Sequence, residues 1–167
     1  MVLKRAALVL LAGVLLTACI DDVEDTAVTL SETGNLRVLH YPCRSDNVVS
    51  ALQLRLLDRG ELDAGANRIL WKVIAIDTRT EGKVEAFEPG RIPGGYRETV
   101  PFDEPSESAK VVVDLETRHG GLGASIPFVW GTLAPGKLVT MEGVKTRSEW
   151  LEYAIIEGCG GTPRAGQ

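Results

Sequence analysis

Three cysteines are the residues best suited to covalent chemistry in this chain: Cys19, Cys43 and Cys159. A cysteine thiolate is a strong nucleophile, so it can take a lipid or pair with a second cysteine. Cys19 follows a basic pair, Lys4-Arg5, an apolar run over residues 6–16 and the small residues Thr17-Ala18. These are the three regions of a secretory signal. The apolar run is too short for a bilayer, which needs roughly 20 residues, so the segment predicts export.

Leu16-Thr17-Ala18-Cys19 resembles the lipobox of bacterial lipoproteins, in which two small residues separate a branched aliphatic residue from a cysteine. The resemblance implies a diacylglyceryl group on Cys19 and cleavage after Ala18, which removes residues 1–18. Two or more acyl chains give stable attachment, whereas one chain binds only reversibly. The chain would then be exported and lipid-anchored on the outer side of the cytoplasmic membrane, or in the outer membrane if the cell has one. The alternative is an ordinary signal peptide with an incidental cysteine.

Cys43 and Cys159 remain once Cys19 carries lipid. In an exported chain an even remainder of two predicts one disulfide. It would close a loop of about 116 residues, for which the chain-entropy model predicts about 4 to 5 kcal/mol of stabilisation. A redox pair or half of a metal site is less favoured, because the chain has no CxxC motif and only two histidines.

Length and charge limit the classes of partner. Removal of residues 1–18 leaves about 149 residues, which suits a single domain. It also removes Lys4 and Arg5, so 23 acidic side chains face 16 basic ones and the net charge is about −7. This acidity argues against binding to nucleic acid and against direct binding to anionic lipid headgroups.

The mature chain divides into a tether, a domain and a tail. Residues 19–34 hold the acylated cysteine and five acidic side chains without a basic one, which predicts an acidic flexible tether. Residues 35–159 carry the alternating apolar pattern of a folded domain. Residues 160–167 predict a disordered tail.

Short alternating runs, separated by turns every 8 to 12 residues, predict a mostly β chain. Residues 69–76 form the strongest expected strand, and because this strand is apolar on nearly both faces we expect it inside a sheet. The fold predicted is a single antiparallel β-sandwich of seven or eight strands. The expected strands cover residues 36–41, 50–56, 69–76, 84–87, 96–102, 110–115, 124–131 and 137–141.

The last element shows a different period. Thr146 and Glu149 fit a capping box, and Trp150, Leu151 and Ala154 follow at helical spacing. A short C-terminal helix is therefore preferred over residues 147–157. A strand through the same residues is the alternative.

No catalytic, cofactor-binding or metal-ligating residue is predicted. His40 lies on an expected strand and His119 on an expected hairpin tip, and no HxH or HExxH spacing links either to another ligand. A hydrolase using two carboxylates stays open as an alternative function, because glycoside hydrolysis needs only a suitably spaced acidic pair. The acidic residues considered are Asp103, Glu104, Asp114 and Glu116.

Residues 89–96 form the one candidate binding loop. Two prolines stiffen it, and it carries Arg91 and Tyr96, whose residue types are enriched at binding hot spots. The favoured alternative is a structural crossover between the two sheets. The three tryptophans, in a chain with few aromatic residues, are expected in the core.

The order of these features resembles small bacterial lipoproteins with an immunoglobulin-like or similar β-sandwich. The resemblance rests on the lipobox, the acidic tether, Ile69-Leu70-Trp71, residues 89–101 and a last element that ends at Cys159. It implies an anchored binding or interaction module of the cell envelope, attached to the membrane through lipid on Cys19. The partner expected is an envelope protein or glycan, and no catalytic residues transfer. A purely structural envelope protein is a further alternative.

Overall fold

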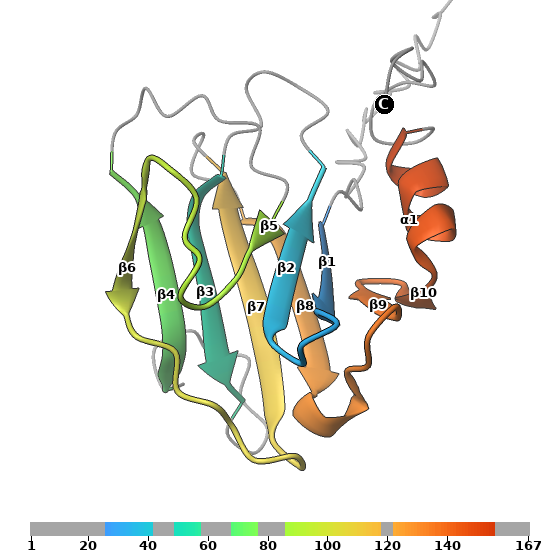
Figure 1. Cartoon of the computed structure of the whole chain (residues 1–167), viewed down its shortest axis with the longest axis horizontal. Coiled ribbons are helices and arrows are strands. Elements are labelled where there is room, and N and C mark those ends of the chain that lie inside the picture. Colours follow the sequence, from blue (N-terminus) through green and yellow to red (C-terminus); the bar gives the residue numbers. More distant parts are fainter. Residues whose placement is uncertain (1–25, 42–48, 58–67, 77–85, 118–121, 156–167) are drawn as a thin grey trace, which may run out of the picture.

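Two antiparallel five-stranded sheets pack face to face in the computed structural model, which describes residues 26–41, 49–57, 68–76, 86–117 and 122–155 (Figure 1). Sheet A has the order β10-β9-β1-β2-β5, and sheet B has the order β6-β4-β3-β7-β8. The strands of sheet A are β1 (Thr26–Leu30), β2 (Leu36–His40), β5 (Ala86–Phe87), β9 (Leu138–Thr140) and β10 (Gly143–Lys145). Those of sheet B are β3 (Val49–Leu56), β4 (Ile69–Ala75), β6 (Tyr96–Val100), β7 (Lys110–Thr117) and β8 (Leu122–Val129). The predicted β-sandwich is confirmed.

The inner faces of both sheets form one hydrophobic core. Alternation places Val38 of β2, Leu52 of β3 and Val113 of β7 between the sheets, each at most 1% exposed. Trp71 of β4 is fully buried there, and β4 lies between β6 and β3, so the prediction of an interior strand is confirmed. All three tryptophans are buried, as expected.

The expected tether contains a core strand. β1 begins at Thr26 and pairs with both β2 and β9, so it lies in the middle of sheet A. Ala27 and Val28 are fully buried. The prediction of a flexible tether through residue 34 is therefore wrong. The acidic residues on either side of β1 dominated the average composition of residues 19–34, and that composition was the basis of the prediction. The domain begins by Thr26, and β1 with β10 brings the described strands to ten, not seven or eight.

A short helix covers the outer face of sheet A. The helix α1 (Arg147–Tyr153) begins with a capping box, in which the Glu149 backbone N–H donates to the Thr146 side chain and the Thr146 backbone N–H donates to Glu149. Trp150 of this helix packs on Ala27, Leu39 and Leu138, which point away from the main core. The helical prediction is thus confirmed over residues 147–153.

The strand directions define two ends of the sandwich (Figure 1). The Thr26 end holds the start of β1 and the end of β2, together with the start of β6. The Ser31 end holds the β1–β2 turn at residues 31–35, the β6–β7 connection at residues 101–109, and residues 130–137. The last segment includes a 3-10 turn at Trp130–Thr132.

Candidate functional site

A buried polar cluster lies on the outer face of sheet B. Asp114 of β7 lies directly opposite Gln53 of β3 on one side and Ser125 of β8 on the other. Ser125 Oγ donates to Asp114 Oδ1 at 2.8 Å, and Gln53 Nε2 donates to Oδ2 at 3.4 Å. Arg55 Nε reaches the same Oδ2 at 2.5 Å. Three side chains from the two strands that flank β7 therefore converge on the Asp114 carboxylate.

The charges of this cluster are withdrawn from water. Asp114 is 3% exposed and Arg55 is 6% exposed. Removing two charges from water costs free energy that their attraction and hydrogen bonds must offset. Arg55 Nη1 is buried without a hydrogen-bond partner, so the compensation is incomplete. Both carboxylate oxygens of Asp114 already accept hydrogen bonds from side chains of the same sheet. This arrangement favours a structural role, in which Asp114 links three strands, over a role as a nucleophile.

The other candidate carboxylates do not pair with Asp114. Asp103 forms an ion pair with Arg68 at the Ser31 end. Glu104 and Glu116 are exposed. The sequence analysis considered Asp114 only as one of four acidic residues, and it missed Arg55 as the partner of Asp114. One feature of the sequence could have indicated a buried ion pair: Asp114 is the single charged residue in the otherwise apolar run of residues 111–115.

The candidate binding loop is a crossover between sheets. Residues 88–95 leave β5 in sheet A and lead to β6 in sheet B, which confirms the favoured alternative. Tyr96 is only 6% exposed, its hydroxyl donates to the Val49 carbonyl at 2.8 Å, and its ring meets Phe87 edge-on at 5.0 Å. The prediction of Tyr96 as a surface binding residue is wrong, because alternation along β6 turns its ring into the core. Arg91 is exposed, and its backbone N–H closes a turn onto Glu88.

The remaining predicted site residues are placed as follows. Cys19, Cys43, Cys159 and His119 lie outside the described residues. His40 is buried at the Thr26 end of β2, where its Nδ1 lies 3.3 Å from Thr26 Oγ1. Across the described ranges no group of three or more His, Cys, Asp and Glu side chains is placed to hold a metal ion.

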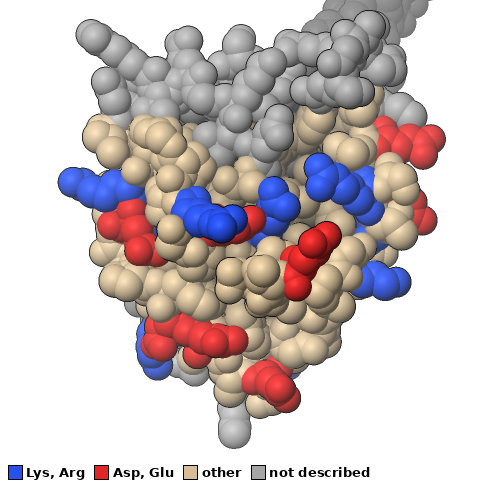
Figure 2. Space-filling view, in the orientation of Figure 1, with Lys and Arg blue, Asp and Glu red and all other residues tan. Residues whose placement is uncertain are grey.

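The Ser31 end presents a firmly held surface. Phe102 packs between Trp71 and Trp130, at ring-centroid distances of 6.3 Å and 5.8 Å. The Gly131 backbone N–H donates to the Glu107 carbonyl at 2.8 Å, which ties residues 101–109 to the segment after β8. The exposed carboxylates at the Ser31 end belong to Glu32, Asp103, Glu104 and Glu107. Figure 2 shows that acidic side chains lie on the lower part of the molecule.

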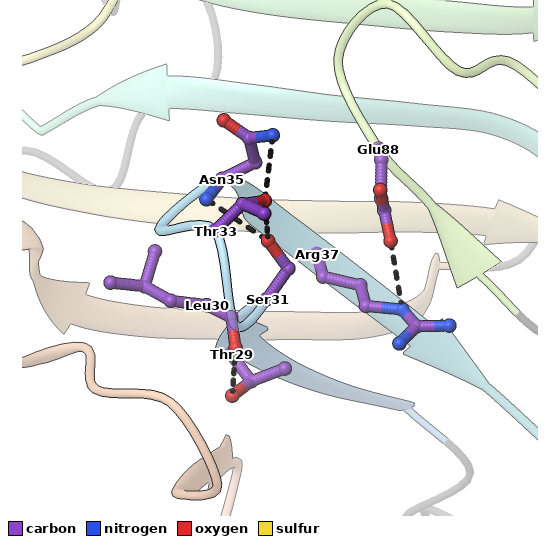
Figure 3. A network of polar contacts seen from close by, with 7 residues as sticks. All are labelled: Thr29, Leu30, Ser31, Thr33, Asn35, Arg37 and Glu88. Atoms are coloured by element: carbon purple, nitrogen blue, oxygen red, sulfur yellow. Dashed lines mark hydrogen bonds and ion pairs between the residues drawn. The ribbon is translucent and has the colours of Figure 1, made fainter.

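The β1–β2 turn at this end is braced by its own side chains (Figure 3). Ser31 Oγ accepts from the Asn35 backbone N–H at 3.1 Å and lies 2.9 Å from Thr33 Oγ1. Gly34 adopts a φ of +81°, which a side-chain-bearing residue rarely takes. Beside the turn, Arg37 on β2 pairs with Glu88 at 3.0 Å. The turn therefore presents a defined backbone at the Ser31 end.

No family model matches the chain, and comparison with curated proteins and with solved structures likewise finds no match. Within the described part of the chain, none of the helices has the length and apolar character needed to cross a membrane.

Proposed function

We propose that this protein is a lipid-anchored module of the cell envelope that binds a protein or glycan partner through its Ser31 end. The observation that carries the proposal is the short distance along the chain from Cys19 to Thr26, where the sandwich begins. A lipid on Cys19 would hold the Thr26 end at the membrane. The opposite end would then face the surrounding compartment.

The Ser31 end has properties that favour binding. Its loops are held by the aromatic packing of Phe102 and by the braced turn at residues 31–35, so little conformational entropy is lost when a partner docks. Its exposed carboxylates favour a partner with basic or hydrogen-bond-donating groups. A disulfide between Cys43 and Cys159 belongs to the same proposal, because an exported chain meets oxidising conditions.

Anchoring is tested by the mass of the N-terminal peptide and by detergent-phase partition. We expect wild-type protein to carry diacylglycerol on Cys19 and to fractionate with membranes. Cys19→Ser should release the protein, whereas the matched variant Thr17→Ser keeps a small residue and should stay anchored. Unmodified Cys19 in membrane-fractionated wild-type protein would refute the anchor.

Binding is tested with a photoreactive amino acid at Glu107, matched by one at Lys72 on the outer face of sheet B. We expect a specific adduct from position 107 only. The captured partner, once purified, should bind wild-type protein and lose affinity for Glu104→Lys/Glu107→Lys. Equal adducts from both positions, or unchanged affinity of the double variant, would count against the Ser31 end as the binding surface.

A further inference from the structure

The edge strand β8 differs from the other edge strands of the two described sheets. It has eight residues and carries no charged side chain. The edge strands of sheet A, β5 and β10, have only two and three residues. At the opposite edge of sheet B, β6 carries Arg97 and an inward-facing carboxylate, Glu98, which accepts a hydrogen bond from Trp71 Nε1 at 2.6 Å. Short length and inward charges protect an edge against further pairing, so β8 is the least protected of these edges.

The backbone of β8 points away from β7 at every second residue. The Trp130 N–H donates to the Ala109 carbonyl at 2.9 Å, which fixes the alternation of hydrogen bonds along the β7–β8 pair. Ser125, Pro127 and Val129 therefore direct their backbone groups to the open side of the strand. Pro127 loses no bond to β7, because proline has no N–H to donate. Along this edge the N–H groups of Ser125 and Val129 bond to no other described backbone group.

Sheet A extends beyond the β8 edge of sheet B. β8 contacts β1 and β9 of sheet A, and Figure 1 shows β10 farther to the right than β8. Val144 of β10 lies opposite Val139, which belongs to the main core, so both side chains lie on the inner face of sheet A. Val139 is 8% exposed, whereas Val144 is 64% exposed. The inner face of β10 is therefore uncovered at the place that a sixth strand of sheet B would occupy.

We propose that an extended segment of a partner protein adds to β8 as an antiparallel sixth strand of sheet B, opposite β10. The backbone of this segment would bond to Ser125 and Val129, and its apolar side chains at alternate positions would cover Val144. The antiparallel direction continues the pattern of β3, β7 and β8. The partner is thus a chain whose exposed segment alternates apolar and polar side chains.

The position of β10 excludes a second copy of the sandwich as this strand. Antiparallel pairing of two β8 strands across a two-fold axis places both A sheets on the same side of the joined B sheets. The β10 strand of one copy would then collide with β1 and β9 of the other, which lie over its β8. A single extended segment brings no second layer and avoids this collision. The site is separate from the Ser31 end and does not require a lipid on Cys19.

The test uses the full-length protein and a fluorescein-labelled peptide in which threonine and valine alternate between two terminal lysines. In an antiparallel sixth strand with its valines inward, the threonine N–H groups face β8 and the valine N–H groups face away. We expect N-methylation of the threonines to abolish binding, measured by fluorescence anisotropy, and N-methylation of the valines to preserve it. Bound peptide should also slow amide hydrogen exchange at Ser125 and Val129.

Two variants test the edge and the inner face of β10 separately. Val129→Pro removes an N–H that points away from β7, so the fold should persist while affinity falls about fivefold to tenfold. Val144→Asp should weaken binding about tenfold, because the new carboxylate would be buried against the valines. Ile76→Asp is the matched control, since Ile76 is 62% exposed and lies outside this site, and it should leave affinity unchanged.

Several results would overturn strand addition at β8. These are a failure of the peptide to bind, binding that survives N-methylation of the threonines, slowed exchange in β6 in place of β8, and unchanged affinity of Val144→Asp. Sedimentation would overturn the choice of partner if it showed a dimer that Val129→Pro dissociates, because a second copy would then occupy the edge. The anchor and the Ser31 surface stand or fall by their own tests.

Discussion

Asp114 shows how one side chain depends on its neighbours. Its carboxylate accepts from Ser125 and pairs with Arg55, and both charges are buried. We predict that Asp114→Ala lowers the free energy of unfolding by about 3 to 5 kcal/mol, because Arg55 is left as an uncompensated buried charge. Glu116→Ala on the same strand should change it by less than about 0.5 kcal/mol. Urea denaturation measures both.

The cause of that loss can be isolated by removing both charges together. Arg55→Met/Asp114→Leu should be more stable than Asp114→Ala alone, because no buried charge remains. A double variant as unstable as Asp114→Ala would show that packing, and not charge pairing, controls this position.

Tyr96 illustrates the opposite case, in which an aromatic residue after a Pro- and Gly-rich loop belongs to the core. We predict that Tyr96→Phe costs about 1 kcal/mol, since it removes only the hydrogen bond to the Val49 carbonyl. Tyr96→Ala should cost about 3 to 5 kcal/mol, because it also leaves a cavity beside Phe87. Thermal unfolding distinguishes the two, and an Ala variant as stable as wild type would contradict a core role.

At the scale of elements, β1 decides where the domain starts. Val28 is fully buried between β2 and β9. We predict that Val28→Ala reduces stability by about 2 kcal/mol, through lost burial and a small cavity. Glu32→Ala in the adjacent turn is the control and should be near neutral. If this segment were a flexible tether, neither variant would change the free energy of unfolding measured by chemical denaturation.

The helix α1 should respond to acid at its N-terminus. The Thr146 backbone N–H donates to Glu149 Oε2 at 2.6 Å and thereby lowers the pKa of Glu149 below its usual value of 4.5. A lowered pKa in the folded state stabilises the fold above the usual pKa, and this contribution disappears as pH falls through the folded value. Lys145 lowers the pKa of Glu142 in the same way.

We therefore predict that helix docking weakens as pH drops below 4.5, with Trp150 near-ultraviolet circular dichroism as the measure. Glu149→Gln keeps a capping hydrogen bond but cannot titrate, so its signal should depend less on pH than that of wild type. An identical pH profile for both proteins would rule out Glu149 as the titrating group.

At the scale of the whole molecule, two described segments that precede Cys43 and Cys159 in the chain pack on one small apolar cluster. Tyr41 lies two residues before Cys43, and it packs on the same small cluster as Leu151 of α1. We predict a Cys43–Cys159 bond, detected by mass spectrometry of a non-reduced digest. Its reduction should cost about 4 to 5 kcal/mol, by the entropy of a loop of about 116 residues. Two free thiols in freshly exported protein would contradict the pairing.

Local patterns in the sequence were enough to predict eight of the strands and the capped helix. These features depend on residues within a few positions of one another, such as the alternation of Leu52 with Gln53 or the reach of Glu149 to Thr146. The export signal and its lipid remain predictions of the sequence. The tertiary structure decided that β1 is a central strand, that Tyr96 is buried and that Arg55 pairs with Asp114. Each of these three features depends on contacts between segments that are distant in the sequence. The burial gained in such contacts decides where a residue lies, even where the composition of its local segment predicts a loop or a tether.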